Sequence, residues 1–196
     1  MPTLLLLIDL QRAFCDAGGS IARQGHDIAP LAAAAAVSDR LAAAARRGGV
    51  PVAWTRMMLR PDYADGGTLI RMRPNLARIG ALRAGTADVE LSAAIHVEER
   101  DVVIDKPRYS SLYATPLEAL LRATRTERVM VGGVTTSMCV ETTVRDLSQR
   151  DFDVAVVEEA CGDFDAARHA ASLAAIAFGF APVVSEANAL AMLAAS

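Results

Sequence analysis

Short apolar runs bounded by polar or turn-forming residues recur along the chain. Such runs are typical of strands that are buried on both faces of a parallel sheet. The first run, TLLLLI, carries only one polar residue and is stopped by Asp9. The pattern predicts six strands, at residues 3–8, 51–55, 101–105, 129–133, 153–157 and 182–184.

Between these runs the spacing of apolar residues becomes helical. The alanine-rich residues 27–47 stop before two glycines, which predicts a helix with its C-terminus there. Thr115, Pro116 and Glu118 have the spacing of a capping box with proline at the first helical position. Further helices are predicted at residues 140–148, 165–178 and 186–194, and irregular chain is predicted at residues 12–27, 56–75 and most of 76–96.

Strands that alternate with helices predict an α/β fold. The expected architecture is a three-layer α/β/α, Rossmann-like arrangement around a six-stranded, mostly parallel sheet. A chain of 196 residues is large enough for one domain to bury about 70% of its unfolded surface. No repeat or composition change divides it, so residues 1–196 are predicted to form a single domain.

Composition and charge exclude several classes of function. A formal net charge of −3 does not favour a nucleic-acid surface. The three cysteines form no C-x-x-C pair, and their odd number argues against a disulfide framework. The apolar run at residues 4–8 is too short for a signal peptide or membrane span. We therefore expect a cytoplasmic protein without nucleic-acid or membrane partners.

Cys139 is predicted to lie in the first turn of the helix that follows the fourth strand. Thr135, Thr136 and Ser137 would supply the N-cap of that helix. Unpaired N–H groups and the helix dipole at that end favour a thiolate and could hold the oxyanion of an acyl intermediate. The alternative is a small buried core residue, since free cysteines are commonly buried.

Asp9, Lys106 and Cys139 each follow the end of a different predicted strand. In an open parallel sheet, ligands bind beyond the carboxyl ends of the strands, so these three side chains are expected in one crevice. The carboxylate can accept the thiol proton, the ammonium can stabilise the resulting anions, and the thiolate can attack a carbonyl. The combination predicts nucleophilic acyl transfer.

Three motifs resemble those of the isochorismatase-like cysteine hydrolases. They are Asp9 with Gln11, the KPRYS run at residues 106–110, and the GVTTSMCVE run at residues 133–141. The resemblance implies one isochorismatase-like domain in which Asp9 is the proton acceptor, Lys106 supports the site and Cys139 attacks an amide or ureido carbonyl.

The resemblance also implies a cis peptide bond between Val134 and Thr135. The N–H of Thr135 would then join that of Cys139 in an oxyanion hole. The runs around Lys106 and Cys139 are most similar to ureidoacrylate, biuret and carbamoyl-amide hydrolases. The nicotinamidase branch carries metal-binding residues after the second strand, whereas residues 54–67 here contain no histidine. We therefore expect no metal and no other cofactor.

Several other residues are candidates for binding the substrate. The resemblance points to Gln11, Arg108 and Tyr109. His169 is expected on a helix face, with some chance of contacting the substrate. The irregular segment carries four arginines that could grip a substrate carboxylate, although most are expected to be solvated or paired with surface acids: Arg56, Arg60, Arg71 and Arg73.

Two other classes of function remain alternatives. Cys139 could be the sensor thiol of a non-enzymatic redox or binding module, with Cys15 or Cys161 nearby. A nucleotide-binding protein is weakly indicated by Gly132 and Gly133, because no complete phosphate-binding motif is present. The 53% content of hydrophobic residues and the family resemblance predict a homo-oligomer, either a dimer or a tetramer.

Overall fold

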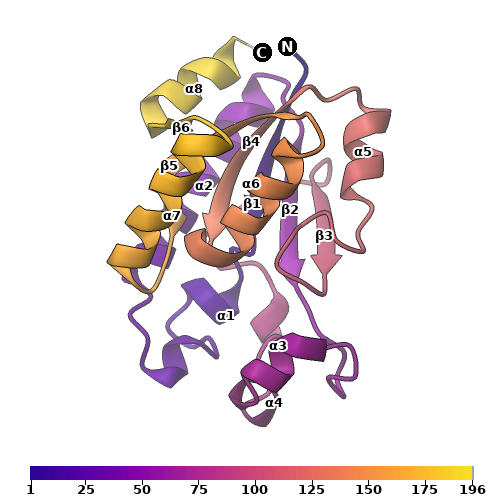
Figure 1. The fold of residues 1–196 in the computed structure, drawn as a ribbon, viewed down its shortest axis with the longest axis vertical. Coiled ribbons are helices and arrows are strands. Elements are labelled where there is room, and N and C mark those ends of the chain that lie inside the picture. The colour runs from indigo at the N-terminus through magenta and orange to yellow at the C-terminus, as the bar shows by residue number, and fades with distance from the viewer. Residues whose placement is uncertain (196) are drawn as a thin grey trace.

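The computed structural model describes residues 1–195 as a six-stranded sheet with helices on both faces (Figure 1). The strand order is β3-β2-β1-β4-β5-β6, and every neighbouring pair is parallel. The predicted fold class is therefore confirmed. The strands are β1 (Thr3–Ile8), β2 (Val52–Met57), β3 (Val102–Lys106), β4 (Arg128–Val134), β5 (Asp153–Gly162) and β6 (Val183–Val184).

Strand β1 lies at the centre of the sheet, between β2 and β4. All six of its residues are buried, which accounts for its unbroken apolar run. Helices α2 and α8 pack together on one face, and α6 and α7 pack on the other (Figure 1). The helices are α1 (Arg12–Cys15), α2 (Ala29–Arg47), α3 (Gly67–Met72), α4 (Asn75–Arg78), α5 (Leu117–Ala123), α6 (Glu141–Ser148), α7 (Ala166–Gly179) and α8 (Glu186–Ala194).

Strand β5 is twice as long as its apolar run predicted. Its register against β4 shifts between Val131 and Gly133, because a longer stretch of β5 lies opposite these residues. Glu158 and Glu159 lie in this stretch and are exposed. Their polarity ends the apolar pattern before the strand itself ends.

The capping box predicted at the start of α5 is wrong. Pro116 occupies the N-cap position and has no side-chain cap, and Thr115 Oγ1 instead accepts a 3.3 Å hydrogen bond from the N–H of Leu117. Glu118 forms ion pairs with Arg122 and Arg150. The residues have the spacing of a capping box, but the carboxylate of Glu118 pairs with these two arginines instead of the backbone at the start of the helix.

Segments predicted to be irregular contain short helices. Residues 12–27 include α1 and the 3-10 turn Ala22–Gln24, and residues 56–78 include α3 and α4. Helices of four to six residues are too short to show an apolar period. Together α1, α3 and α4 lie beyond the carboxyl ends of the central strands (Figure 1). Across residues 1–195, no helix combines the length and hydrophobicity needed to span a bilayer.

Gly133 allows β4 to approach β1 closely. Its φ is +132°, and a Cβ atom there would lie 2.2 Å from the carbonyl oxygen of Ile8. The backbones of Gly133 and Ile8 are both held in the sheet, so neither can move at low energetic cost. Glycine at this position therefore determines how the end of β4 lies beside the end of β1.

We predict that Gly133→Ala lowers the free energy of unfolding by at least about 3 kcal/mol, because it combines a strained φ with a backbone clash. Chemical denaturation would measure the change. Gly25→Ala is the matched control: φ is +82° there, but no atom lies within 4 Å of the added Cβ. Its cost should be about 1 kcal/mol, and equal losses in the two variants would contradict the account.

Candidate active site

Asp9 follows β1 directly and turns sharply away from the strand. Its φ is +55°, in the left-handed region that aspartate tolerates better than most residues. The backbone N–H of Asp9 donates to the carbonyl of Thr55 at 3.0 Å, and Oδ1 accepts from the Thr55 hydroxyl at 2.8 Å. The carboxylate is fully buried. Its position is therefore set by the adjacent strand β2.

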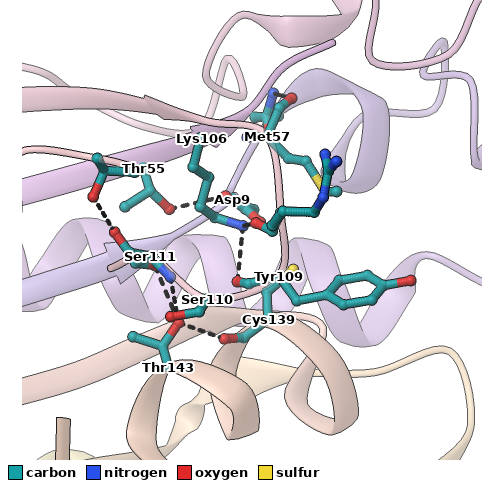
Figure 2. A network of polar contacts seen from close by, with 12 residues as sticks. Asp9, Thr55, Met57, Lys106, Tyr109, Ser110, Ser111, Cys139 and Thr143 are labelled. Carbon is teal, nitrogen blue, oxygen red and sulfur yellow. Dashed lines mark hydrogen bonds and ion pairs between the residues drawn. The ribbon is translucent and has the colours of Figure 1, made fainter. Parts of the chain in front are cut away.

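Lys106 is the last residue of β3 and is also buried. Its Nζ lies 2.6 Å from Asp9 Oδ2. Figure 2 draws both side chains. The same ammonium donates to the carbonyls of Arg108 at 2.9 Å and Tyr109 at 3.1 Å. Two of the three N–H donors are therefore used by carbonyls, and the charge of the Asp9 carboxylate balances that of the ammonium.

Burial alone would lower the pKa of Lys106, but the charge of Asp9 and the nearby Cys139 sulfur outweigh it and raise the pKa. The lysine is therefore cationic at neutral pH. Oδ2 of Asp9 accepts no well-directed hydrogen bond from the described chain, although the lysine charge lies beside it. A lone pair of Asp9 is left available for another proton.

Cys139 lies in η3 (Thr136–Val140), a single π-helical turn that leads into α6. The carbonyl of Thr135 accepts hydrogen bonds from the N–H groups of Met138 and Val140, each at 3.2 Å, but not from that of Cys139, which lies between them. The peptide bond between Val134 and Thr135 is cis, where the resemblance predicted it.

The expectation that the start of the helix favours a thiolate at Cys139 is wrong. Burial raises the pKa of its thiol to about 12; Asp9 adds to the rise and Lys106 opposes it. A single turn before α6 stabilises the anion less than loss of water destabilises it. The resting group is a thiol, and it lies close enough to Asp9 for the carboxylate to influence its pKa.

Hydroxyl groups fasten the loop after Lys106 to the turn that carries Cys139. Thr143 Oγ1 accepts from the N–H of Ser111 at 3.0 Å and donates to the carbonyl of Cys139 at 2.7 Å (Figure 2). Ser110 Oγ donates to Asp146 on α6. The lysine and the cysteine are therefore held by one connected network.

A second group of contacts holds the same turn from β5 and α7. Asp163 Oδ2 accepts from the N–H of Ser137 at 2.9 Å and from its hydroxyl at 2.6 Å. His169 Nδ1 lies 2.8 Å from Thr136 Oγ1, and Ser172 Oγ donates to the Thr136 carbonyl at 3.3 Å. Asp163 thus replaces the N-cap predicted from Thr135, Thr136 and Ser137, which make no side-chain cap.

These supporting residues carried no local sequence signal. Asp163 and Ser172 are distant from Cys139 along the chain, and only the crossover from β4 to β5 brings them to the turn. His169, predicted on a helix face, contacts Thr136 and is absent from the lining of the pocket at Cys139. Sequence spacing alone cannot reveal such contacts.

A pocket of about 50 Å³ opens onto Cys139. Tyr109 and Thr135 line it. Gln11 and Arg108 do not. Gln11 exchanges hydrogen bonds with the backbone of Met57 and donates to Val89, and Arg108 donates to the carbonyls of Asp65 and Pro107, so both support neighbouring loops.

The four arginines of residues 56–75 differ in the groups that they contact. Arg56 pairs with Asp105 and Arg60 with Asp62, as expected for most of them. Arg71 donates to the hydroxyl of Thr68. Only Arg73 of the four lines the pocket at Cys139.

The cysteines do not have the character of sensor thiols, which are exposed and of low pKa. Cys15, Cys139 and Cys161 are all buried and free, and burial raises the pKa of each. Within residues 1–195, no three His, Cys, Asp or Glu side chains gather closely enough to hold a metal ion.

Comparisons with known proteins place this geometry in context. The family profile described as "Isochorismatase domain" matches residues 3–188. The ureidoacrylate amidohydrolase RutB of Methylorubrum extorquens is 33% identical over 171 residues, covering 81% of this chain and 68% of that protein. The RutB protein of Cronobacter turicensis is 31% identical over 170 residues, covering 80% of this chain and 72% of its own.

Solved structures share the fold. A cysteine hydrolase from Pseudomonas syringae pv. phaseolicola 1448A has a TM-score of 0.91 at 29% identity, covering 99% of this chain and 93% of that one. The N-carbamoylsarcosine amidase of Thermoplasma acidophilum has a TM-score of 0.77 at 23% identity, covering 95% and 97% of the two chains. The second likeness concerns the fold alone.

We predict that Lys106→Met lowers the free energy of unfolding by about 3–5 kcal/mol, because it leaves the buried carboxylate of Asp9 without its counter-charge. The double variant Asp9→Asn/Lys106→Met should recover most of that loss, since no isolated charge remains. Denaturant unfolding of both single variants and the double variant would give the coupling energy. Purely additive losses would show that the pair is not coupled.

Proposed function

This chain belongs to the isochorismatase domain family, and from that premise we propose that it hydrolyses a small amide or ureido C–N bond through a thioester on Cys139. The observation that carries the proposal is the buried carboxylate of Asp9, which lies between a lysine ammonium and a cysteine thiol. No contact among the described residues gives Asp9 Oδ2 a well-directed hydrogen bond. Its free lone pair is where the thiol proton goes.

In the first half of the reaction, Asp9 accepts the proton of Cys139 as sulfur adds to the substrate carbonyl. Proton transfer coupled to attack avoids a free buried thiolate, which a thiol pKa of about 12 makes costly. Lys106 keeps the site near neutrality throughout, since its positive charge balances either the carboxylate or the developing anion.

The carbonyl oxygen becomes an oxyanion in the tetrahedral intermediate. The N–H groups of Thr135 and Cys139 are the donors we assign to it. One feature supports this choice: the Thr135 carbonyl accepts the N–H groups of both neighbours of Cys139, Met138 and Val140. Donors fixed before the reaction stabilise charge without reorganisation.

Collapse of the intermediate breaks the C–N bond. The leaving nitrogen takes the proton held on Asp9 and departs as ammonia or an amine, leaving an acyl group on sulfur. Asp9 then accepts a proton from water, the resulting hydroxide adds to the thioester, and Cys139 leaves and is reprotonated. Both halves use the same two groups in opposite directions.

The relatives support the type of bond. Two are named ureidoacrylate amidohydrolases, and a structural neighbour is named a cysteine hydrolase. We propose a substrate of this chemical kind, with Tyr109 on the pocket wall. We further propose that residues 1–196 act as one catalytic domain, that the protein works in the cytoplasm, and that it assembles as a homo-oligomer. The terminal residue 196 lies outside the described residues.

We predict that Cys139→Ser lowers kcat/KM at least about 1,000-fold, since an alcohol is a far weaker nucleophile than a thiol beside the same base. Ammonia release from biuret, carbamoyl amino acids, maleamate and nicotinamide would be measured for wild type and variant. Cys161→Ala removes another buried thiol, at the end of β5, and should retain turnover. Undiminished activity in a folded Cys139→Ser protein would refute the proposal.

A further inference from the structure

Asp163 is a buried carboxylate that the proposed reaction does not use. It directly follows β5, and its side chain is 1% exposed. Its ion pair is with Arg168, whose Nη2 lies 3.4 Å away and whose own side chain is 58% exposed. Burying a carboxylate costs free energy, and an exposed arginine offsets little of that cost. The contacts of Asp163 with the rest of the site must therefore account for its charge.

Those contacts go to Ser137, the second residue of η3 and two residues before Cys139. Asp163 Oδ2 accepts from the N–H of Ser137 at 2.9 Å and from its hydroxyl at 2.6 Å. Hydrogen bonds to an ionised acceptor are about twice as strong as those between neutral groups. The start of the turn that carries the cysteine is therefore held by a charge from a separate strand.

The N–H groups on both sides of Cys139 are engaged by acceptors. The N–H of Ser137 donates to the carboxylate. Those of Met138 and Val140 donate to the carbonyl of Thr135, each at 3.2 Å. A peptide N–H cannot turn independently of its planar group, so these bonds fix the peptide planes next to the cysteine. They thereby set the direction of the Cys139 N–H, one of the two donors that we assign to the oxyanion.

The end of the sheet fixes where the carboxylate lies. The parallel ladder between β4 and β5 ends with the pair Val134 and Gly162, so Asp163 begins just beyond the last paired residues. The next residue, Phe164, lines the same pocket as Cys139. One contact from Asp163 to η3 therefore relates the pocket wall at Phe164 to the turn that carries the nucleophile.

We infer that Asp163 is a positioning residue for the reaction. Its carboxylate holds the turn so that the N–H of Cys139 is aimed at the oxyanion before that charge forms. Asp163 exchanges no proton with the substrate, because the thiol proton goes to Asp9. The inference rests on the proposed function, since it assigns the oxyanion to this turn. It adds a residue from β5 to a site otherwise built from β1, β3 and the turn after β4.

Steady-state kinetics separate positioning from binding. Asp163→Ala should lower kcat about 100-fold, the usual effect of a small misplacement of reacting groups. KM should change little, because the oxyanion forms only after the substrate is bound. Both halves of the reaction pass through an oxyanion, so kcat should fall whichever half is slower. Asp163→Asn keeps an oxygen acceptor without the charge and should recover part of the loss. It also carries the test if Asp163→Ala does not fold.

A neighbouring aspartate supplies the matched control. Asp165 accepts the N–H of Arg168 at 2.8 Å as the N-cap of α7, and it has no hydrogen bond to η3. Asp165→Ala removes a cap and lowers stability, but kcat should not change. Ser137→Ala loses only the hydroxyl bond and should retain most of kcat. Equal losses of kcat in Asp163→Ala and Asp165→Ala, or a change confined to KM, would overturn the inference.

Addition to an aldehyde distinguishes failure of this inference from failure of the proposed function. The Cys139 sulfur bonds to the carbonyl carbon of isotopically labelled acetaldehyde, and the thiol proton passes to its oxygen. The resulting thiohemiacetal has no C–N bond to break, and NMR spectroscopy measures its dissociation constant. Asp163→Ala should weaken the adduct at least about 10-fold, whereas Asp165→Ala should not.

The outcomes separate as follows. If amides are not hydrolysed but the adduct depends on Asp163, the positioning role stands and the hydrolase proposal falls. An adduct that is equally stable with and without the Asp163 carboxylate refutes the inference. A wild-type protein that forms no adduct refutes it too, because no oxyanion is then held at the turn.

Discussion

The buried ion pair between Asp9 and Lys106 is the constraint on which the rest of this structure depends. Both side chains are removed from water, so neither can be kept without the other, and each needs further polar partners. The strand order provides them, because β2 lies between β1 and β3 and places Thr55 beside Asp9. Carbonyls after β3 complete the shell of the lysine.

The same constraint explains why the cysteine is both inert and usable. Because burial raises its pKa to about 12, the Cys139 thiol is expected to react slowly with oxidants and alkylating agents in the resting protein. In the proposed reaction it becomes a nucleophile only when a carbonyl is bound, because Asp9 then accepts its proton. The proposal thereby links reactivity to occupancy of the pocket that opens onto Cys139.

Local pattern was sufficient for the sheet and for the three ionisable groups. The apolar run of β1 and the positions of Asp9, Lys106 and Cys139 after strand ends placed them at one edge, where the structure brings them together. Competition between distant groups was not predictable. Burial reversed the expected thiolate, and Asp163 took over a cap assigned to nearby hydroxyls. The short helices around the pocket are too brief to show an apolar period. The structure was therefore needed to show that Arg73, alone of the four arginines, lines the pocket.

The central claim is that one acyl group passes through Cys139 whatever amine leaves. Partitioning between water and added hydroxylamine tests it most directly, in a series of substrates with one acyl group and different leaving amines. A shared thioester predicts the same ratio of hydroxamate to acid for every member, because the leaving group has gone before the choice is made. A ratio that changes with the leaving amine would mean that water attacks the substrate directly, and it would contradict the account.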